Sequence, residues 1–231
     1  MSAPPVYTVS VSRRSPRTTV LGPGVRAVIW VRGCPLHCEG CVAPQDLPFT
    51  GGERWSVDDL AAWLNELPTD VSGLTLSGGE PMAQAAGLSA LIERVRAGRD
   101  WSVLSYSGYT LEHLRRHGDA AQHRLLEQLD ILIDGPYMRH RHGDLLWRGS
   151  ANQRVHFLTA RHVPPADDRS AGIELHVNDD GVSWVGVPPV PDFRTGFETA
   201  MRDQGIRLSM TGDDPHDPEQ QTEKGGADDV G

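Results

Sequence analysis

All three cysteines of the chain, Cys34, Cys38 and Cys41, lie within eight consecutive residues. An odd number of cysteines at such close spacing is a poor disulfide framework, but it suits a metal site. The preceding residues 26–32 are apolar and β-branched, which predicts a buried strand. Whatever fold the chain adopts must therefore present three thiols on one loop at the C-terminal end of a buried strand.

The C-x3-C-x2-C spacing favours an iron–sulfur cluster. Thiolates are the usual ligands of such clusters and a complete set is four, so three cysteines leave one iron open to another ligand. One alternative is a structural zinc site in which His37 is the fourth ligand. Zinc sites usually combine two ligand pairs across a longer loop, and the adjacent His37 and Cys38 would point in different directions. A chance cluster of inert cysteines is the other alternative, but such residues have no reason to share a loop.

Strand-like and helical segments alternate along the first 160 residues, which predicts parallel βα units. The expected strands are residues 7–11, 26–32, 73–76, 101–106, 130–134 and 154–159, and the expected helices are 57–67, 82–97, 111–117 and 120–128. Ser56 is expected to cap the first helix, together with Asp59. The chain is too short for an eight-unit barrel of ~250 residues, so we expect an α/β fold with a partial, open (βα) barrel. Functional residues in such folds lie at the C-terminal ends of the strands.

Three regions are expected from composition. Residues 1–160 form the core domain, and residues 161–210 form a small extension with a hairpin across Asn178-Asp179-Asp180-Gly181 and a helix at 193–204. Residues 211–231 carry seven acidic residues and one lysine, and therefore six of the chain's nine net negative charges. We expect this acidic tail to be solvated and disordered.

Charge and hydropathy exclude several classes of function. The chain has no basic patch of the kind that binds nucleic acid. It has no apolar run of ~20 residues for a membrane span, and its N-terminus lacks the pattern of a signal peptide. We therefore expect a cytoplasmic protein that binds neither nucleic acid nor membrane.

Six short motifs occur in the order in which one family has them. Together with the cysteine spacing they resemble the radical S-adenosylmethionine (SAM) superfamily, specifically the activating proteins of anaerobic ribonucleoside-triphosphate reductase, which are relatives of pyruvate formate-lyase activating enzymes. The motifs are residues 22–24 (GPG), 32–35 (RGCP), 77–81 (SGGEP), 106–109 (YSGY), 133–137 (IDGPY) and 147–153 (WRGSANQ). The resemblance covers roughly residues 22–158.

The resemblance implies roles for particular residues. It makes Cys34, Cys38 and Cys41 the ligands of one [4Fe–4S] cluster. Backbone contacts to SAM are implied for two segments: Gly40, Cys41 and Val42, and Gly78, Gly79 and Glu80. From the residues alone, the second segment could equally be a tight strand-to-helix turn, which also favours glycine. No catalytic residue is assigned beyond the cluster.

The resemblance also implies an activity. The reduced cluster would cleave SAM to a 5′-deoxyadenosyl radical, which abstracts hydrogen from a glycine of a partner glycyl radical enzyme, most naturally anaerobic ribonucleotide reductase. A flavodoxin- or ferredoxin-type protein would donate the electron. The extension after Arg161, and Ala43 where the subgroup often has Asn, leave a second interpretation open, in which the enzyme modifies another peptide or small molecule. A non-enzymatic electron-transfer or metal-binding module would not need Gly78-Gly79-Glu80.

Overall fold

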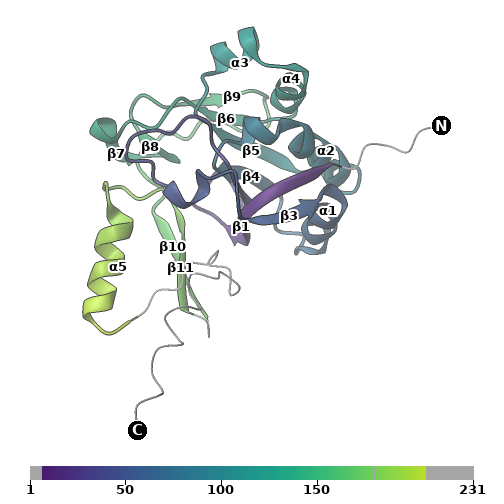
Figure 1. Cartoon of the computed structure of the whole chain (residues 1–231). Coiled ribbons are helices and arrows are strands. Elements are labelled where there is room, and N and C mark those ends of the chain that lie inside the picture. The colour runs from purple at the N-terminus through teal and green to yellow at the C-terminus, as the bar shows by residue number, and fades with distance from the viewer. Residues whose placement is uncertain (1–6, 179–180, 207–231) are drawn as a thin grey trace, which may run out of the picture.

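The computed structural model describes residues 7–178 and 181–206, so the predicted acidic tail lies outside the described residues. A seven-stranded sheet with the order β3-β1-β2-β4-β5-β6-β9 forms its centre (Figure 1). The strands are β1 (Thr8–Thr18), β2 (Arg26–Val31), β3 (Glu53–Ser56), β4 (Gly73–Gly78), β5 (Ser102–Ser107), β6 (Ile131–Asp134) and β9 (Arg154–Phe157).

The four central strands β2, β4, β5 and β6 are parallel, and β1, β3 and β9 add antiparallel strands at the two edges. This arrangement confirms the expected α/β fold and is consistent with a partial (βα) barrel. The four parallel strands end at one edge of the sheet, and each is followed by one of the predicted motifs. In the described part of the chain, no helix is long and apolar enough to cross a membrane.

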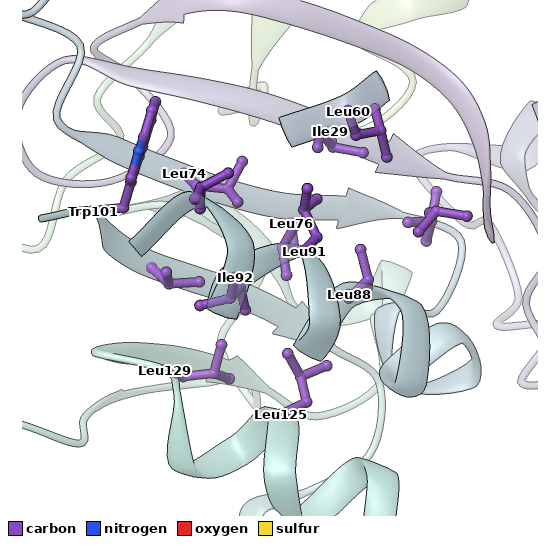
Figure 2. Packing of buried hydrophobic residues seen from close by; sticks show 14 of the residues in the cluster. Ile29, Leu60, Leu74, Leu76, Leu88, Leu91, Ile92, Trp101, Leu125 and Leu129 are labelled. Atoms are coloured by element: carbon purple, nitrogen blue, oxygen red, sulfur yellow. The ribbon is translucent and has the colours of Figure 1, made fainter. Parts of the chain in front are cut away.

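Helices cover one face of the sheet. They are α1 (Val57–Glu66), α2 (Ala85–Arg96), α3 (Leu111–His117) and α4 (Ala120–Glu127). The predicted cap of α1 is confirmed, because Ser56 Oγ accepts a hydrogen bond from the Asp59 N–H at 3.1 Å. Apolar stripes at helical spacing pack against alternate residues of the strands. Figure 2 shows this core, which includes Ile29, Leu60, Leu74, Leu76, Leu88, Leu91, Ile92 and Leu125.

Two predicted elements differ from the observed bounds by more than two residues. The first strand is eleven residues long rather than five, because β1 pairs with both β2 and β3 even where its sequence is rich in arginine. The helix expected from residue 82 begins instead as a short 3-10 helix, η2 (Pro81–Gln84), before α2. The Glu80 side chain caps η2 by accepting a hydrogen bond from the Met82 N–H at 2.9 Å.

The other face of the sheet is partly covered by the extension. The predicted hairpin is present as β10 (Ile173–Asn178) and β11 (Gly181–Gly186), and it is followed by α5 (Phe193–Asp203). From β11 and the residue after it, Val185 and Val187 pack in one cluster with Val28 and Trp30 of β2. A second small hairpin, β7 (His142–Leu145) with β8 (Arg148–Ser150), lies between β6 and β9 in the sequence.

Candidate functional site

One cavity lies at the C-terminal ends of the parallel strands. Its volume is about 1000 Å³ when the open solvent at its mouth is included. The cysteine loop, the strand ends and the β10–β11 hairpin all contribute to its walls. Of the predicted site residues, it brings together Cys34, Cys38, Cys41, Val42, Gly78, Gly79 and Glu80. Gly40 is not in its wall; it is exposed and adopts a positive φ of 67°.

The cysteine loop is fixed at its start by backbone hydrogen bonds. The Gly33 N–H donates to the Asp46 carbonyl at 2.8 Å, and the Cys34 N–H donates to the Leu47 carbonyl at 3.0 Å. At its far end, Cys41 Sγ accepts a hydrogen bond from the Ala43 N–H at 3.4 Å. The loop therefore folds back on itself and keeps the three cysteines on the cavity side.

The thiols fit a cluster better than a single metal ion. Among the described residues, no three His, Cys, Asp or Glu side chains are gathered as ligands of one ion, so neither a Cys₃His site nor a set of three thiols around one ion is preformed. Burial raises the pKa of the Cys34 and Cys41 thiols, so loading a metal must release protons from this loop. Three soft sulfur donors on one cavity are a donor set suited to an iron–sulfur cluster, which spans more space than one ion.

Gly78 and Gly79 lie at the end of β4, beside the end of its parallel neighbour β2. Gly78 has a φ of 96°, and a Cβ on it would lie 2.4 Å from the Val31 carbonyl oxygen. A Cβ on Gly79 would lie 2.3 Å from the Gly33 carbonyl oxygen. The tight turn that the sequence allowed as an alternative is therefore present. The turn alone explains why both positions are glycine. Backbone contact with SAM remains a prediction for this segment.

Glu80 is fully buried, and both of its carboxylate oxygens are used within the protein. Oε1 accepts hydrogen bonds from the Met82 N–H at 2.9 Å and from Ser107 Oγ at 3.0 Å, while Oε2 accepts one from the Gly108 N–H at 2.8 Å. Burial raises the pKa of Glu80 to about 7. The side chain thus ties the 77–81 motif to the 106–109 motif, a role that the sequence did not reveal.

The remaining motifs build the loops around the cavity. Asp134 is buried; it accepts a hydrogen bond from the Leu111 N–H at 2.6 Å and forms an ion pair with Arg154 at 2.7 Å. Asn152 Nδ2 donates to the Pro136 carbonyl at 2.7 Å. Tyr106 Oη donates to the Trp147 carbonyl at 2.6 Å. Each of these side chains orders backbone at the strand ends.

Some residues of the cavity were missed by sequence reasoning. Arg13 and Trp30 come from β1 and β2, and Trp184, Val187 and Pro188 come from the extension. The alternation of residues along a strand could have placed Arg13 beside Trp30, but only once the long β1 was recognised. Nothing local in the sequence indicates that a hairpin 150 residues later returns to this cavity.

Comparisons with known proteins agree with the motifs. Residues 20–156, more than half of the chain, match the family described as the 4Fe-4S single cluster domain. The anaerobic ribonucleoside-triphosphate reductase-activating protein of Vibrio cholerae is 36% identical over 152 residues, covering 62% of this chain and 95% of that protein. Proteins of the same name from Escherichia coli K12 and Enterobacteria phage T4 are 32% and 33% identical over 152 and 153 residues. These alignments cover 62% and 64% of this chain and 95% and 93% of the relatives.

The matched segment contains all three cysteines and the Gly78-Gly79-Glu80 turn that share the cavity with them. On these grounds the chain belongs to the 4Fe-4S single cluster domain family and, within it, to the radical SAM enzymes of the glycyl-radical activating type.

Proposed function

We propose that this enzyme cleaves SAM reductively and uses the resulting radical to install a glycyl radical on an anaerobic ribonucleoside-triphosphate reductase. The observation that carries the proposal is the single cavity lined by three cysteines and by the glycine-rich end of β4. The name shared by the relatives supports the choice of partner. The division into a radical SAM core at 1–160, an extension at 161–210 and a tail at 211–231 belongs to the same proposal.

Cys34, Cys38 and Cys41 would hold three irons of the cluster and leave the fourth open to the amino and carboxylate groups of SAM. When bound and reduced, the cluster supplies the electron that breaks a bond of the SAM sulfonium. The chain itself positions SAM and protects the radical. Because Gly78 and Gly79 have no Cβ, the backbone of this segment can approach the methionyl group of SAM, and Gly40, Cys41 and Val42 would act in the same way from the cysteine loop.

The walls of the cavity would keep water from the radical. Leu21, Trp30, Val42 and Val187 present apolar surface to it. An apolar lining excludes water, so SAM and the hydrogen donor would be the main occupants of the cavity. The absence of water also strengthens the electrostatic contacts that orient them. The partner's glycine would enter through the open mouth, and a flavodoxin- or ferredoxin-type protein would supply the electron.

Anaerobic reconstitution tests this proposal. The full chain is loaded with iron and sulfide, reduced with dithionite and mixed with SAM, and 5′-deoxyadenosine is measured. A purified anaerobic ribonucleoside-triphosphate reductase is then added, and its glycyl radical is sought by electron paramagnetic resonance. We expect both products. A protein that takes up no iron, or that binds zinc and cleaves nothing, would contradict the proposal.

A second candidate is a different hydrogen donor, and the extension favours it. Val187 and Trp184 narrow the cavity from a hairpin beyond the matched segment, which ends at residue 156. The alignments span 93–95% of the three relatives but at most 64% of this chain, so much of the extension has no counterpart in them. Formation of 5′-deoxyadenosine without a glycyl radical on the reductase would favour this candidate.

A further inference from the structure

Two adjacent arginines on β1 face opposite sides of the sheet. Arg13 Cζ lies 4.0 Å from the centroid of the Trp30 ring, on the side of the cavity that it lines. Arg14 Cζ lies 3.8 Å from the centroid of the Trp55 ring and 4.7 Å from that of Trp63, two rings that pack with the helix-covered core. Both arginines precede the matched segment 20–156, so the family comparison assigns a role to neither.

The extension helps to hold Arg13 in place. Its Nη1 donates a hydrogen bond to the Trp184 carbonyl of β11 at 3.5 Å, while the Trp30 ring supports one face of the guanidinium. A guanidinium has five N–H donors in a rigid plane, so it can keep contacts within the protein and also donate to a ligand in the cavity. Arg13 is therefore a positioned cation rather than a free surface charge.

Arg13 is also the one cation among the described residues that line the cavity. The other charged side chain of the lining, Glu80, uses both carboxylate oxygens for protein donors. SAM carries one anionic group, its methionyl carboxylate, and guanidinium–carboxylate pairs are among the strongest hydrogen-bonded pairs in proteins. An apolar cavity strengthens such a pair further.

We propose that Arg13 binds the methionyl carboxylate of SAM, and that Trp30 and the β10–β11 hairpin hold its guanidinium in position for this contact. The inference rests on the proposed use of SAM in this cavity. It gives β1 and the extension, two segments outside the matched family region, a common part in binding the cosubstrate.

The experiment compares Arg13→Gln with Arg14→Gln. These neighbours lose the same charge and a similar stacking contact, but on opposite faces of one strand. Each full-length protein is loaded with its cluster anaerobically, and the dissociation constants of SAM and of 5′-methylthioadenosine, which lacks the amino and carboxylate groups, are measured by equilibrium dialysis. For Arg13→Gln we expect SAM to bind about 10- to 100-fold more weakly, the range for one hydrogen-bonded charge.

The same substitution should leave 5′-methylthioadenosine binding unchanged, and Arg14→Gln should change neither constant. Arg13→Lys keeps the charge without the planar fork, so it should give an intermediate loss and serves if Arg13→Gln does not fold. An unchanged SAM affinity in Arg13→Gln, or an equal loss for both ligands, would overturn the inference while leaving SAM cleavage by the wild type intact. A cluster-loaded wild type that binds no SAM would instead remove the proposed function, and this inference with it.

Discussion

The sheet core and the extension contribute to the same cavity but are built differently. In the core, helix residues such as Leu88 and Leu91 are fully buried against strands on the covered face of the sheet. In the hairpin, burial is one-sided: Val185 is 5% exposed, whereas Val177 on the partner strand is 78% exposed. The core therefore has a continuous apolar interior. The extension has a small apolar cluster, which forms only where the hairpin packs against the face of the sheet opposite the helices.

The ties between the two regions are mostly polar and near the surface. Glu174 accepts hydrogen bonds from the backbone N–H and the hydroxyl of Thr19 at 2.8 and 2.6 Å, and Asp168 forms a two-bond ion pair with Arg148. Exposed contacts of this kind contribute little free energy compared with apolar burial. We therefore expect the hairpin to unfold locally at a lower free energy than the central sheet. The part of the cavity wall that the hairpin forms is then the less stable part.

The largest expected effect is a loss of SAM cleavage without a loss of stability, in the variant Cys38→Ala. Cys38→Ala removes one thiol from a half-buried loop position, so we expect no SAM cleavage above background while the thermal unfolding midpoint of the cluster-free protein stays nearly unchanged. Reconstitution followed by the 5′-deoxyadenosine assay and a thermal melt measures both. Normal cleavage by this variant would remove Cys38 from the ligand set.

His37→Ala is the matched control for that variant. The His37 side chain is exposed, and the residue adopts a positive φ of 46°, beside Cys38 in the same loop. Under the cluster assignment the variant should still take up iron and cleave SAM. If His37→Ala lost metal as completely as Cys38→Ala does, the Cys₃His zinc alternative would regain support.

The next effect concerns stability in the core. Glu80→Ala leaves the buried Met82 and Gly108 N–H groups without their carboxylate acceptor, and we expect a loss of about 3–5 kcal/mol in the free energy of unfolding. Chemical denaturation of the cluster-free protein measures this loss. A loss below 1 kcal/mol would mean that these strand ends do not depend on Glu80.

The buried carboxyl also predicts a pH dependence. Its pKa is raised by burial to about 7 from an ordinary value near 4.5, so ionisation disfavours the folded state. The contribution of Glu80 is therefore fully present below about pH 4.5 and falls by about 3 kcal/mol as the pH rises through 7. Glu80→Gln cannot ionise and should flatten this part of the stability curve between pH 5 and 8. An identical slope in the two proteins would contradict the assigned pKa.

The sequence was informative about the core for physical reasons. Residues 27–31 are continuously apolar because β2 is buried on both faces. Ser56 with Asp59 signals a helix start through local hydrogen bonding. The cysteine spacing predicted three thiols on one loop, and Cys34, Cys38 and Cys41 line one cavity because they are close in sequence. These features depend on interactions within one element or between neighbours.

Features that depend on distant contacts were not predictable in the same way. The long β1 is specified by pairing with β2 and β3, and its arginines are accommodated by stacking on Trp30, Trp55 and Trp63. The part of the cavity wall made by Trp184 depends on how the hairpin docks, which no local pattern encodes. The hairpin itself was predicted, but its contact with the cavity was not.

A core-like substitution in the extension tests how strongly the hairpin is held. Val185→Ala removes two methyl groups from the cluster with Val28 and Trp30. We expect the free energy of local opening of residues 173–187 to fall by about 1–2.5 kcal/mol. Native-state hydrogen exchange measures this opening, and the protection of β4 and β5 should not change. Val177→Ala, on an exposed position of the same hairpin, is the control and should have no effect. Equal loss of protection in the hairpin and the central strands would show that the two regions unfold together.

The smallest expected effect concerns the ion pair that joins the two regions. Arg148 of the 147–153 motif is only 13% exposed at its side chain, but its partner Asp168 is 62% exposed, so solvent weakens the pair. Arg148 lowers the pKa of Asp168, and the stabilisation is present above the ordinary pKa of an aspartate and is lost as the pH falls below it. We expect Asp168→Asn to lower the free energy of local opening by about 0.5–1 kcal/mol at pH 7, with no difference from wild type near pH 2.

Asp167→Asn is the matched control, because Asp167 forms a local ion pair with the exposed Arg169, two residues away. A larger loss in Asp168→Asn than in Val185→Ala would reverse the comparison, since the extension would then be held by charge rather than by apolar burial.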